Sequence, residues 1–404
     1  MANGVYRPGS AADQDCQATS SAYDNSGNNA YIGNANSTDN QYHALFNLDI
    51  PKDATIDSAY LYLYCDNRLG TVNGSVTAED SDDASAYTSN PYSRSQIGTS
   101  VTWNGMLPTV WEWDKSPDIK TVIQAIVNRS GWASGNAIGL VVTAPGLGSN
   151  NYVRTIQSNY GGKIYPVLIV EWHTLTKYVR ASTIAASADD TYNKDNDTTD
   201  NRSAAFARFG HDGTNSFRAF FRFNAKVHKG SDVTSIDGAH LIVAADSQLD
   251  TTGWYGSIGT LEDESSFPSG SSVYSRSLIS GQTAVNWSVE GWSAEGVYVS
   301  PDIANPISYR VEQEGYDPDG SGDAPYIGIR IDQGDANAKN EYRNICAYDR
   351  TGLGDFLPTL VVAYTIATSG NATVNVPALD MSLAADVPAV EMLTRVNVPA
   401  LDMS

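Results

Sequence analysis

The sequence predicts an all-β protein: two tandem β-sandwich or jelly-roll domains, each with one short helix, followed by a tail of 11-residue repeats. Two observations predict this fold. Short aromatic or branched apolar segments alternate with turns rich in Gly, Asn, Ser and Asp, and the same blocks occur twice in the same order. The 404 residues, 41% of them hydrophobic, are also enough to build sizeable cores.

Seven sequence blocks of the N-terminal half recur in the C-terminal half. The block Ser116–Ile119 recurs identically as Ser300–Ile303. The other matches are Ile56–Leu61 with Ile236–Leu241, Tyr92–Ser95 with Tyr274–Ser277, Val101–Asn104 with Val285–Ser288, Ile138–Leu140 with Ile327–Ile329, Arg154 and Ile156 with Arg343 and Ile345, and Pro166–Val170 with Pro358–Val362. The shared order indicates a duplication, with domains over 1–173 and 174–365.

Individual elements follow from local patterns. The aromatic-rich runs 59–64 and 219–223 are typical of strands. Only Ile119–Asn128 and Ile303–Glu312 favour a helix, because Ser-Pro-Asp precedes the apolar residues in both copies. Proline suits the first helical turn, and Ser116 or Ser300 is the predicted N-cap.

The tail, residues 366–404, repeats a Val-Pro-Ala unit every 11 residues. Proline at that spacing forbids one continuous regular helix. Two interpretations stay open: a linker or fragment of a longer array, and a docking segment that binds a partner or a sister chain. The second, which we favour, would use the apolar positions Val376, Leu379, Met381, Val387, Met392, Val398 and Leu401.

The chain is acidic, with 25 Lys and Arg against 46 Asp and Glu and a net charge of -21. This charge argues against a nucleic acid partner, because phosphate binding needs a basic surface. No run approaches the roughly 20 apolar residues of a membrane helix, so no membrane insertion is expected. The N-terminal residues do not resemble a signal peptide, which fits a virion component released by lysis or a re-started mature chain. Of the three cysteines, Cys16 and Cys65 could pair, but isolated buried thiols are favoured.

The order of the blocks resembles the DNRLRE-type domain family, jelly-roll modules similar to carbohydrate-binding modules. The family's Arg-led strand is matched by Arg218–Phe223, where the first copy departs with His43–Leu48. Its Val-Thr-Trp motif is matched by Val101–Trp103 and less well by Val285–Trp287. The resemblance covers about 90% of the chain. It implies a binding or structural module on a surface or phage protein rather than a catalyst.

The search for chemistry finds no nucleophile, metalloprotease or phosphate-loop motif, so no catalytic residue is assigned and we expect no enzyme. The one cofactor candidate is Ca²⁺. Acidic and hydroxyl side chains in an Asp-x-Asp-Gly-Ser-Gly-Asp turn resemble the first half of a calcium loop, although the later bidentate Glu is absent. The candidate ligands are Asp317, Asp319, Ser321 and Asp323. A solvated turn is the alternative.

Aromatic residues without a match in the other copy are the candidate contact residues, because matched positions serve the fold. These are Trp111, Trp113, Trp254 and Tyr255. Exposed rings of this kind can stack on a sugar or pack against a partner subunit. Packing over their own domain is the alternative.

Three functions are consistent with these patterns. The favoured one is a non-enzymatic structural or adhesion protein on a virus particle exterior, of decoration or fibre type. Its partners would be capsid or other virion proteins, sister copies and host-surface polysaccharide. The alternatives are a secreted or cell-surface carbohydrate-binding protein and a subunit of an extracellular filament. All three predict an extracellular location.

Overall fold

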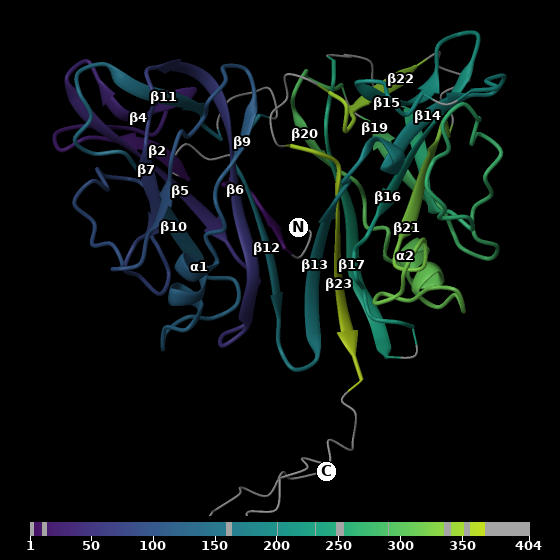
Figure 1. Ribbon diagram of the computed structural model, residues 1–404. Coiled ribbons are helices and arrows are strands. Elements are labelled where there is room, and N and C mark those ends of the chain that lie inside the picture. The colour runs from purple at the N-terminus through teal and green to yellow at the C-terminus, as the bar shows by residue number, and fades with distance from the viewer. Residues whose placement is uncertain are drawn as a thin grey trace, which may run out of the picture. The chain divides into compact units, whose positions relative to one another are not determined.

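In the computed structural model the regular structure of the described residues is mostly β-strand, as predicted, and each repeat contributes one α-helix (Figure 1). The structure describes residues 4–9, 14–158, 164–199, 201–230, 232–247, 254–289, 291–334, 341–350 and 356–367. Met1–Ala367 forms one unit and Thr368–Ser404 a second. The seven predicted docking positions of the tail lie outside the described residues.

The first repeat contains β1 (Val5–Tyr6), β2 (Asp15–Ala18), β3 (Tyr23–Asp24), β4 (Asn29–Ala35), β5 (Thr38–Asn47), β6 (Thr55–Leu69), β7 (Gly74–Ala78), β8 (Val101–Trp103), β9 (Trp113–Lys115), α1 (Lys120–Val127), β10 (Ala137–Thr143), β11 (Asn151–Ile156) and β12 (Val167–His173). The second contains β13 (Lys177–Thr183), the 3₁₀ turn η1 (Ser187–Asp189), β14 (Asp190–Lys194), β15 (Phe206–His211), β16 (Ser216–Phe223), β17 (Val233–Ala244), β18 (Trp254–Thr260), β19 (Val285–Val289), β20 (Val297–Val299), α2 (Ala304–Val311), β21 (Ile327–Asp332), β22 (Tyr342–Cys346) and β23 (Thr359–Ile366).

The strand pairing repeats from one copy to the other. Strand β5 pairs with β2 and β10, as β16 pairs with β14 and β21. Strand β6 pairs with β9 and β12, as β17 pairs with β20 and β23. Strand β7 pairs with β8 and β10, as β18 pairs with β19 and β21. The two halves therefore share one topology.

The Ser-Pro-Asp block connects the start of the helix to the neighbouring strand through side-chain hydrogen bonds. Helix α1 begins and ends within a residue of the predicted bounds, but its N-cap is Ile119, without a side-chain cap. Ser116 instead accepts the N–H of Leu61 through its hydroxyl at 2.9 Å. Asp118 accepts the N–H groups of Ala59 and Lys120, each at 3.0 Å. The predicted N-cap role of Ser116 is wrong, because its hydroxyl is held by β6.

The second copy repeats this connection. Helix α2 starts after Ile303, again without a side-chain cap. The Ser300 hydroxyl accepts the N–H of Leu241 at 2.9 Å. Asp302 accepts the N–H groups of Ala239 and Ala304 at 2.9 Å each. The predicted N-cap role of Ser300 is likewise wrong, and the identity of the two blocks has a structural cause.

The pairing corrects two matches made from the sequence. Tyr152 pairs with Gly33 and Tyr342 with Gly210, and both glycines have positive φ, 97° and 115°. Tyr152 therefore corresponds to Tyr342, and Arg154 corresponds to Asn344 rather than to Arg343. In the same way, Ala44 pairs with Leu140 and Phe221 with Ile329, so Ala44 corresponds to Phe221. The residue three positions earlier in each strand is Gln41 in the first copy and Arg218 in the second, so Gln41 rather than His43 matches Arg218.

One continuous sheet joins the two copies. Its strand order is β17, β23, β13, β12, β6 (Figure 1). Strand β13 alone therefore lies between β12, the last strand of the first repeat, and β23, the last strand of the second. Side chains alternate along β23. Val361 and Ala363 belong to the core of the first copy, and Val362 and Tyr364 to the core of the second. The two cores thus lie on opposite faces of the shared strand.

The thiols are isolated, as favoured from the sequence. Cys16, Cys65 and Cys346 are all free and buried. Burial raises the pKa of Cys65 to about 12, so this thiol is inert as a nucleophile at neutral pH. Within the described ranges, neither helix is long and apolar enough to cross a bilayer.

Candidate functional site

The first aromatic pair presents one ring to solvent and buries the other. Trp111 is 58% exposed, whereas Trp113 is 1% exposed. The Trp113 ring lies 5.5 Å from that of Tyr64 and 5.1 Å from that of Phe356, between centroids. Its indole N–H donates to the carbonyl of Glu295 at 3.2 Å. The prediction that Trp113 is an exposed contact residue is wrong, because it packs between the two copies.

The second pair divides in the same way. Trp254 is 2% and Tyr255 36% exposed. Both belong to β18, whose successive side chains point to opposite faces. The Trp254 ring packs 5.6 Å from Phe209, and the Arg343 guanidinium lies 5.3 Å from it. Trp254 is therefore a core residue, which corrects its prediction as a contact residue. Trp111 and Tyr255 keep the predicted exposure.

The acidic turn is held by contacts within the protein. Asp323 accepts a hydrogen bond from Arg222 at 2.8 Å. Asp317 accepts the N–H of Asp319 at 3.0 Å, as in an ordinary Asx-turn. Across the described ranges, no three His, Cys, Asp or Glu side chains are grouped to hold a metal ion. The predicted ligands, Asp317, Asp319, Ser321 and Asp323, are thus not grouped around a common point in the part of the chain that the structure describes, and calcium binding at this turn stays a prediction.

A cleft of about 540 Å³ lies between the two copies. Its walls come from β1 and the segment before β12 on one side, and from β17, β19 and β20 on the other. The residues that matter for binding are Arg7, Tyr165, His240, Asn286, Trp287, Ser288 and Tyr298. A volume of this size fits a ligand of several rings.

Aromatic side chains of the second core line one side of this cleft, where Trp287, Trp292 and Tyr298 are 6%, 1% and 7% exposed. Trp292 and Tyr298 stack with centroids 4.6 Å apart and planes at 12°. Trp287 lies against Trp292 at 5.7 Å. Tyr165 on the opposite side donates its hydroxyl to the carbonyl of Val297 at 3.1 Å. This bond joins the copies across the cleft and fixes the position of the Tyr165 ring.

Polar groups around the rings provide hydrogen-bond donors and acceptors. Arg7 donates to the Tyr165 hydroxyl at 2.5 Å, and its guanidinium lies 4.9 Å from the ring centroid. His240 donates from Nδ1 to the carbonyl of Ser300 at 2.9 Å, which leaves Nε2 as its other polar atom. Asn286 adds an amide and Ser288 a hydroxyl. The cleft thus combines apolar faces with groups suited to hydroxyls.

Sequence reasoning missed this cleft because its residues come from distant segments. Arg7 and Asn286 are almost 280 residues apart in the chain, and neither lies in a motif. The match Val101–Trp103 with Val285–Trp287 gave a signal of a different kind. It identified Trp287 as a shared fold residue, and Trp287 does stack against Phe209 with centroids 6.2 Å apart.

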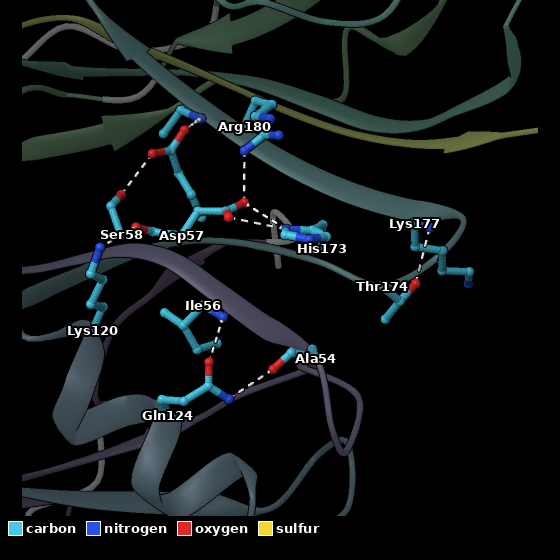
Figure 2. Close-up of polar contacts among 12 residues, drawn as sticks. Ala54, Ile56, Asp57, Ser58, Lys120, Gln124, His173, Thr174, Lys177 and Arg180 are labelled. Atoms are coloured by element: carbon cyan, nitrogen blue, oxygen red, sulfur yellow. Dashed lines mark hydrogen bonds and ion pairs between the residues drawn. The ribbon is translucent and has the colours of Figure 1, made fainter. Parts of the chain in front are cut away.

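A second polar cluster lies where the two sandwiches share their sheet (Figure 2). Asp57 accepts hydrogen bonds from Arg180 at 2.7 Å and from His173 Nδ1 at 3.0 Å. Ser58 donates to Glu171 at 2.6 Å. Three neighbouring strands, β6, β12 and β13, supply these side chains. A hollow of about 390 Å³ adjoins Glu171 and Arg180.

These contacts define a cross-strand network rather than a nucleophile with its base. A catalytic serine would donate its hydroxyl to a histidine. Here the Ser58 hydroxyl is directed at Glu171, and His173 is stacked on Tyr178 with centroids 5.4 Å apart. The Asp57 charge is balanced by Arg180. We assign the network to holding the copies together.

The comparisons with known proteins give no family. No family model matches the sequence, and no curated protein matches it. Among solved structures, similarity is found to PNGase F, a glycosylasparaginase from Flavobacterium meningosepticum, at 10% identity and a TM-score of 0.19 over 85% of this chain and 97% of that one. A second, PNGF-II, has 10% identity and a TM-score of 0.18 over 82% of this chain and 60% of that one. At these TM-scores the likeness carries no argument about fold or function.

Proposed function

We propose that this protein is a non-enzymatic adhesion protein of a particle exterior, and that it binds a glycan in the cleft between its two sandwiches. The observation that carries the proposal is the cleft itself. Sugars have apolar faces that pack on aromatic rings and hydroxyls that both donate and accept. The part-exposed Tyr165 ring offers the apolar contact, and Arg7 and Asn286 beside it in the cleft offer the polar contacts.

Features outside the cleft support a setting on a virus particle. The tandem sandwiches are joined through one sheet, and an apolar repeat tail suits attachment to sister copies or to other exterior proteins. The resemblance to DNRLRE-type modules supports binding rather than catalysis. A secreted or cell-surface carbohydrate-binding protein would use the same cleft. A filament subunit would depend on the tail instead.

Glycan binding is tested by screening the full chain against a glycan panel and measuring Kd by calorimetry for each hit. Removing the Tyr165 ring with Tyr165→Ala is expected to weaken binding about fivefold or more, since a stacked ring contributes on the order of 1 kcal/mol. Asn286→Ala, which removes an amide, should have a similar effect. Trp111→Ala, on an exposed ring outside the cleft, should leave Kd unchanged.

Two controls make this result specific. Tyr165→Phe keeps the ring and should lose less than about threefold in affinity, which separates stacking from the hydroxyl bond to Val297. If Trp111→Ala abolished binding while Tyr165→Ala and Asn286→Ala did not, the site would lie at Trp111. If no glycan bound at all, the adhesion proposal would be wrong.

The assembly role of the tail has its own test. Deleting Thr368–Ser404 leaves β23, which ends at Ile366, intact. We expect the full chain to be an oligomer and the shortened chain a monomer in light scattering at equal concentration. Circular dichroism should show that both keep the β-structure. Two monomers would rule out self-assembly through the tail under those conditions.

A further inference from the structure

Asp15 and Asp190 occupy the same position in the two copies. Asp15 pairs with Ala44 and Asp190 with Phe221, positions that correspond in β5 and β16. Both aspartates are buried, with 1% and 0% of their surface exposed. A carboxylate buried this deeply needs hydrogen bonds or a counter-charge. The duplication therefore allows a direct comparison of how each copy satisfies the same group.

The first copy satisfies Asp15 with hydroxyl and amide donors. Its Oδ1 accepts the Ser158 hydroxyl at 2.6 Å. Its Oδ2 accepts the Ser158 N–H at 2.8 Å and the Tyr42 hydroxyl at 2.8 Å. Both oxygens are thus bonded within the protein.

The second copy keeps only one of these three donors. Asp190 Oδ2 accepts the N–H of Tyr348 at 2.8 Å, and Tyr348 stands where the first copy has Ser158. Tyr42 pairs with Val142 in the first copy, and Ala219 pairs with Ile331 at the equivalent position of the second. Ala219 therefore replaces Tyr42. Both hydroxyl donors are therefore missing. Asp190 Oδ1 is buried and accepts no hydrogen bond from any described residue.

The second copy also adds negative charge at this place. The Ser187 hydroxyl donates to Asp349 Oδ1 at 2.9 Å, while Asp349 Oδ2 is buried and bonds to no described group. Burial is the main reason that the pKa of Asp190 rises to about 8, and the neighbouring carboxylates of Asp349 and Asp189 contribute to that rise. Asp189 itself is paired with Arg222 at 3.3 Å. The Tyr348–Asp190 and Ser187–Asp349 bonds hold the two segments together, so two carboxylates, each with one buried oxygen that bonds to no described group, lie at the same junction.

We propose that Asp190 and Asp349 bind a calcium ion that takes the place of the lost hydroxyl donors. The side chains offer oxygen only, which is the donor set of Ca²⁺ rather than of zinc or copper. Two carboxylates are fewer than the three side chains of a typical protein-only metal cage, in keeping with the absence of such a cage from the described residues. Peptide carbonyls and water complete the six to eight ligands that Ca²⁺ takes.

The ion would connect two segments far apart in the chain. Asp190 begins β14, directly after the turn η1, and Asp349 follows β22. In the first copy the Ser158 bonds make the same connection between β2 and the end of β11. Calcium would therefore stabilise the second sandwich at the point where hydrogen bonds stabilise the first. This site is separate from the Asp317 turn and independent of glycan binding in the cleft.

The test uses the full chain after treatment with a chelator. With 10 mM CaCl₂ the melting temperature should rise by roughly 3–8 °C, as expected for a native-state ligand at about 10 to 100 times its Kd. Calorimetry should give one site with a Kd of about 10⁻⁴–10⁻³ M, the range of extracellular calcium modules. Asp349→Asn should abolish both effects. The carboxylate of Asp349 is only part-buried, so this variant is expected to fold even if Asp190→Asn does not.

Matched variants separate this site from general attraction to a chain of charge -21. Asp317→Asn and Asp15→Asn should leave the calcium-dependent rise unchanged. Equal concentrations of MgCl₂ should give less than half of it. The proposal is overturned if Ca²⁺ leaves the wild-type melting temperature unchanged, if Asp349→Asn retains the full rise, or if Mg²⁺ matches Ca²⁺. If Asp190→Asn is more stable than the metal-free wild type and Ca²⁺ has no effect, the pair shares a proton instead.

Discussion

Trp113→Ala is expected to lower the free energy of unfolding by about 3–5 kcal/mol, the cost of emptying a buried tryptophan site. The Trp113 ring fills space between Tyr64 and Phe356, which lie in the two different copies. Its indole N–H also satisfies the Glu295 carbonyl. Removing the ring thus leaves a cavity and an unbonded carbonyl at the junction of the sandwiches. Urea unfolding followed by fluorescence measures the loss.

The neighbouring tryptophan is the matched control. Trp111→Ala removes the same number of atoms from a ring that is 58% exposed, so the free energy of unfolding should change by less than about 0.5 kcal/mol. A similar loss in both variants would mean that Trp113 is not packed between the copies. A loss in Trp113→Ala with two separate unfolding transitions would show that this ring couples the two copies.

The sequence predicted the elements best where the two copies agree. Both helices were placed within about one residue at each end, because the identical Ser-Pro-Asp blocks precede them. The function of that block was misjudged. Serine and aspartate before a helix suggest a cap, but here Ser116 and Asp118 bond to the edge of β6, a partner 55 or more residues away. The local sequence pattern predicts where the helix lies, but the hydrogen-bond partners of these side chains are known only from the folded structure.

The candidate site was harder to predict for two physical reasons. A strand alternates its side chains, so two adjacent aromatics such as Trp254 and Tyr255 cannot both face solvent. That rule was available from the sequence once the strand was recognised. The cleft was not available, because Arg7 and Asn286 are brought together only by the shared sheet. The difference between Asp15 and Asp190 could not be predicted from the sequence either. It becomes visible only when Arg154 is matched with Asn344 instead of Arg343, which is a shift of one residue.

Arg310→Ile is expected to destabilise the second sandwich by about 3–5 kcal/mol at pH 8, because it leaves a buried carboxylate unpaired. Arg310 lies on α2 with its side chain 4% exposed, and its Nε is 2.8 Å from Glu264 Oε1. It also donates to the carbonyl of Tyr326 at 3.0 Å. The first copy has Ile126 at this place on α1, fully buried.

The pH dependence gives this prediction its sharpest check. Burial raises the pKa of Glu264 to about 7, even though Arg310 opposes the rise, so losing Arg310 raises it further. A carboxyl whose folded pKa exceeds its unfolded value of about 4.5 loses stability as pH rises between those two values. The defect of Arg310→Ile should therefore be largest near pH 8 and clearly smaller at pH 5, measured as urea midpoints. Adding Glu264→Gln should recover most of it at pH 8. A loss that is equal at both pH values and not recovered by Glu264→Gln would show that Arg310 contributes through packing and its bond to Tyr326 rather than through Glu264.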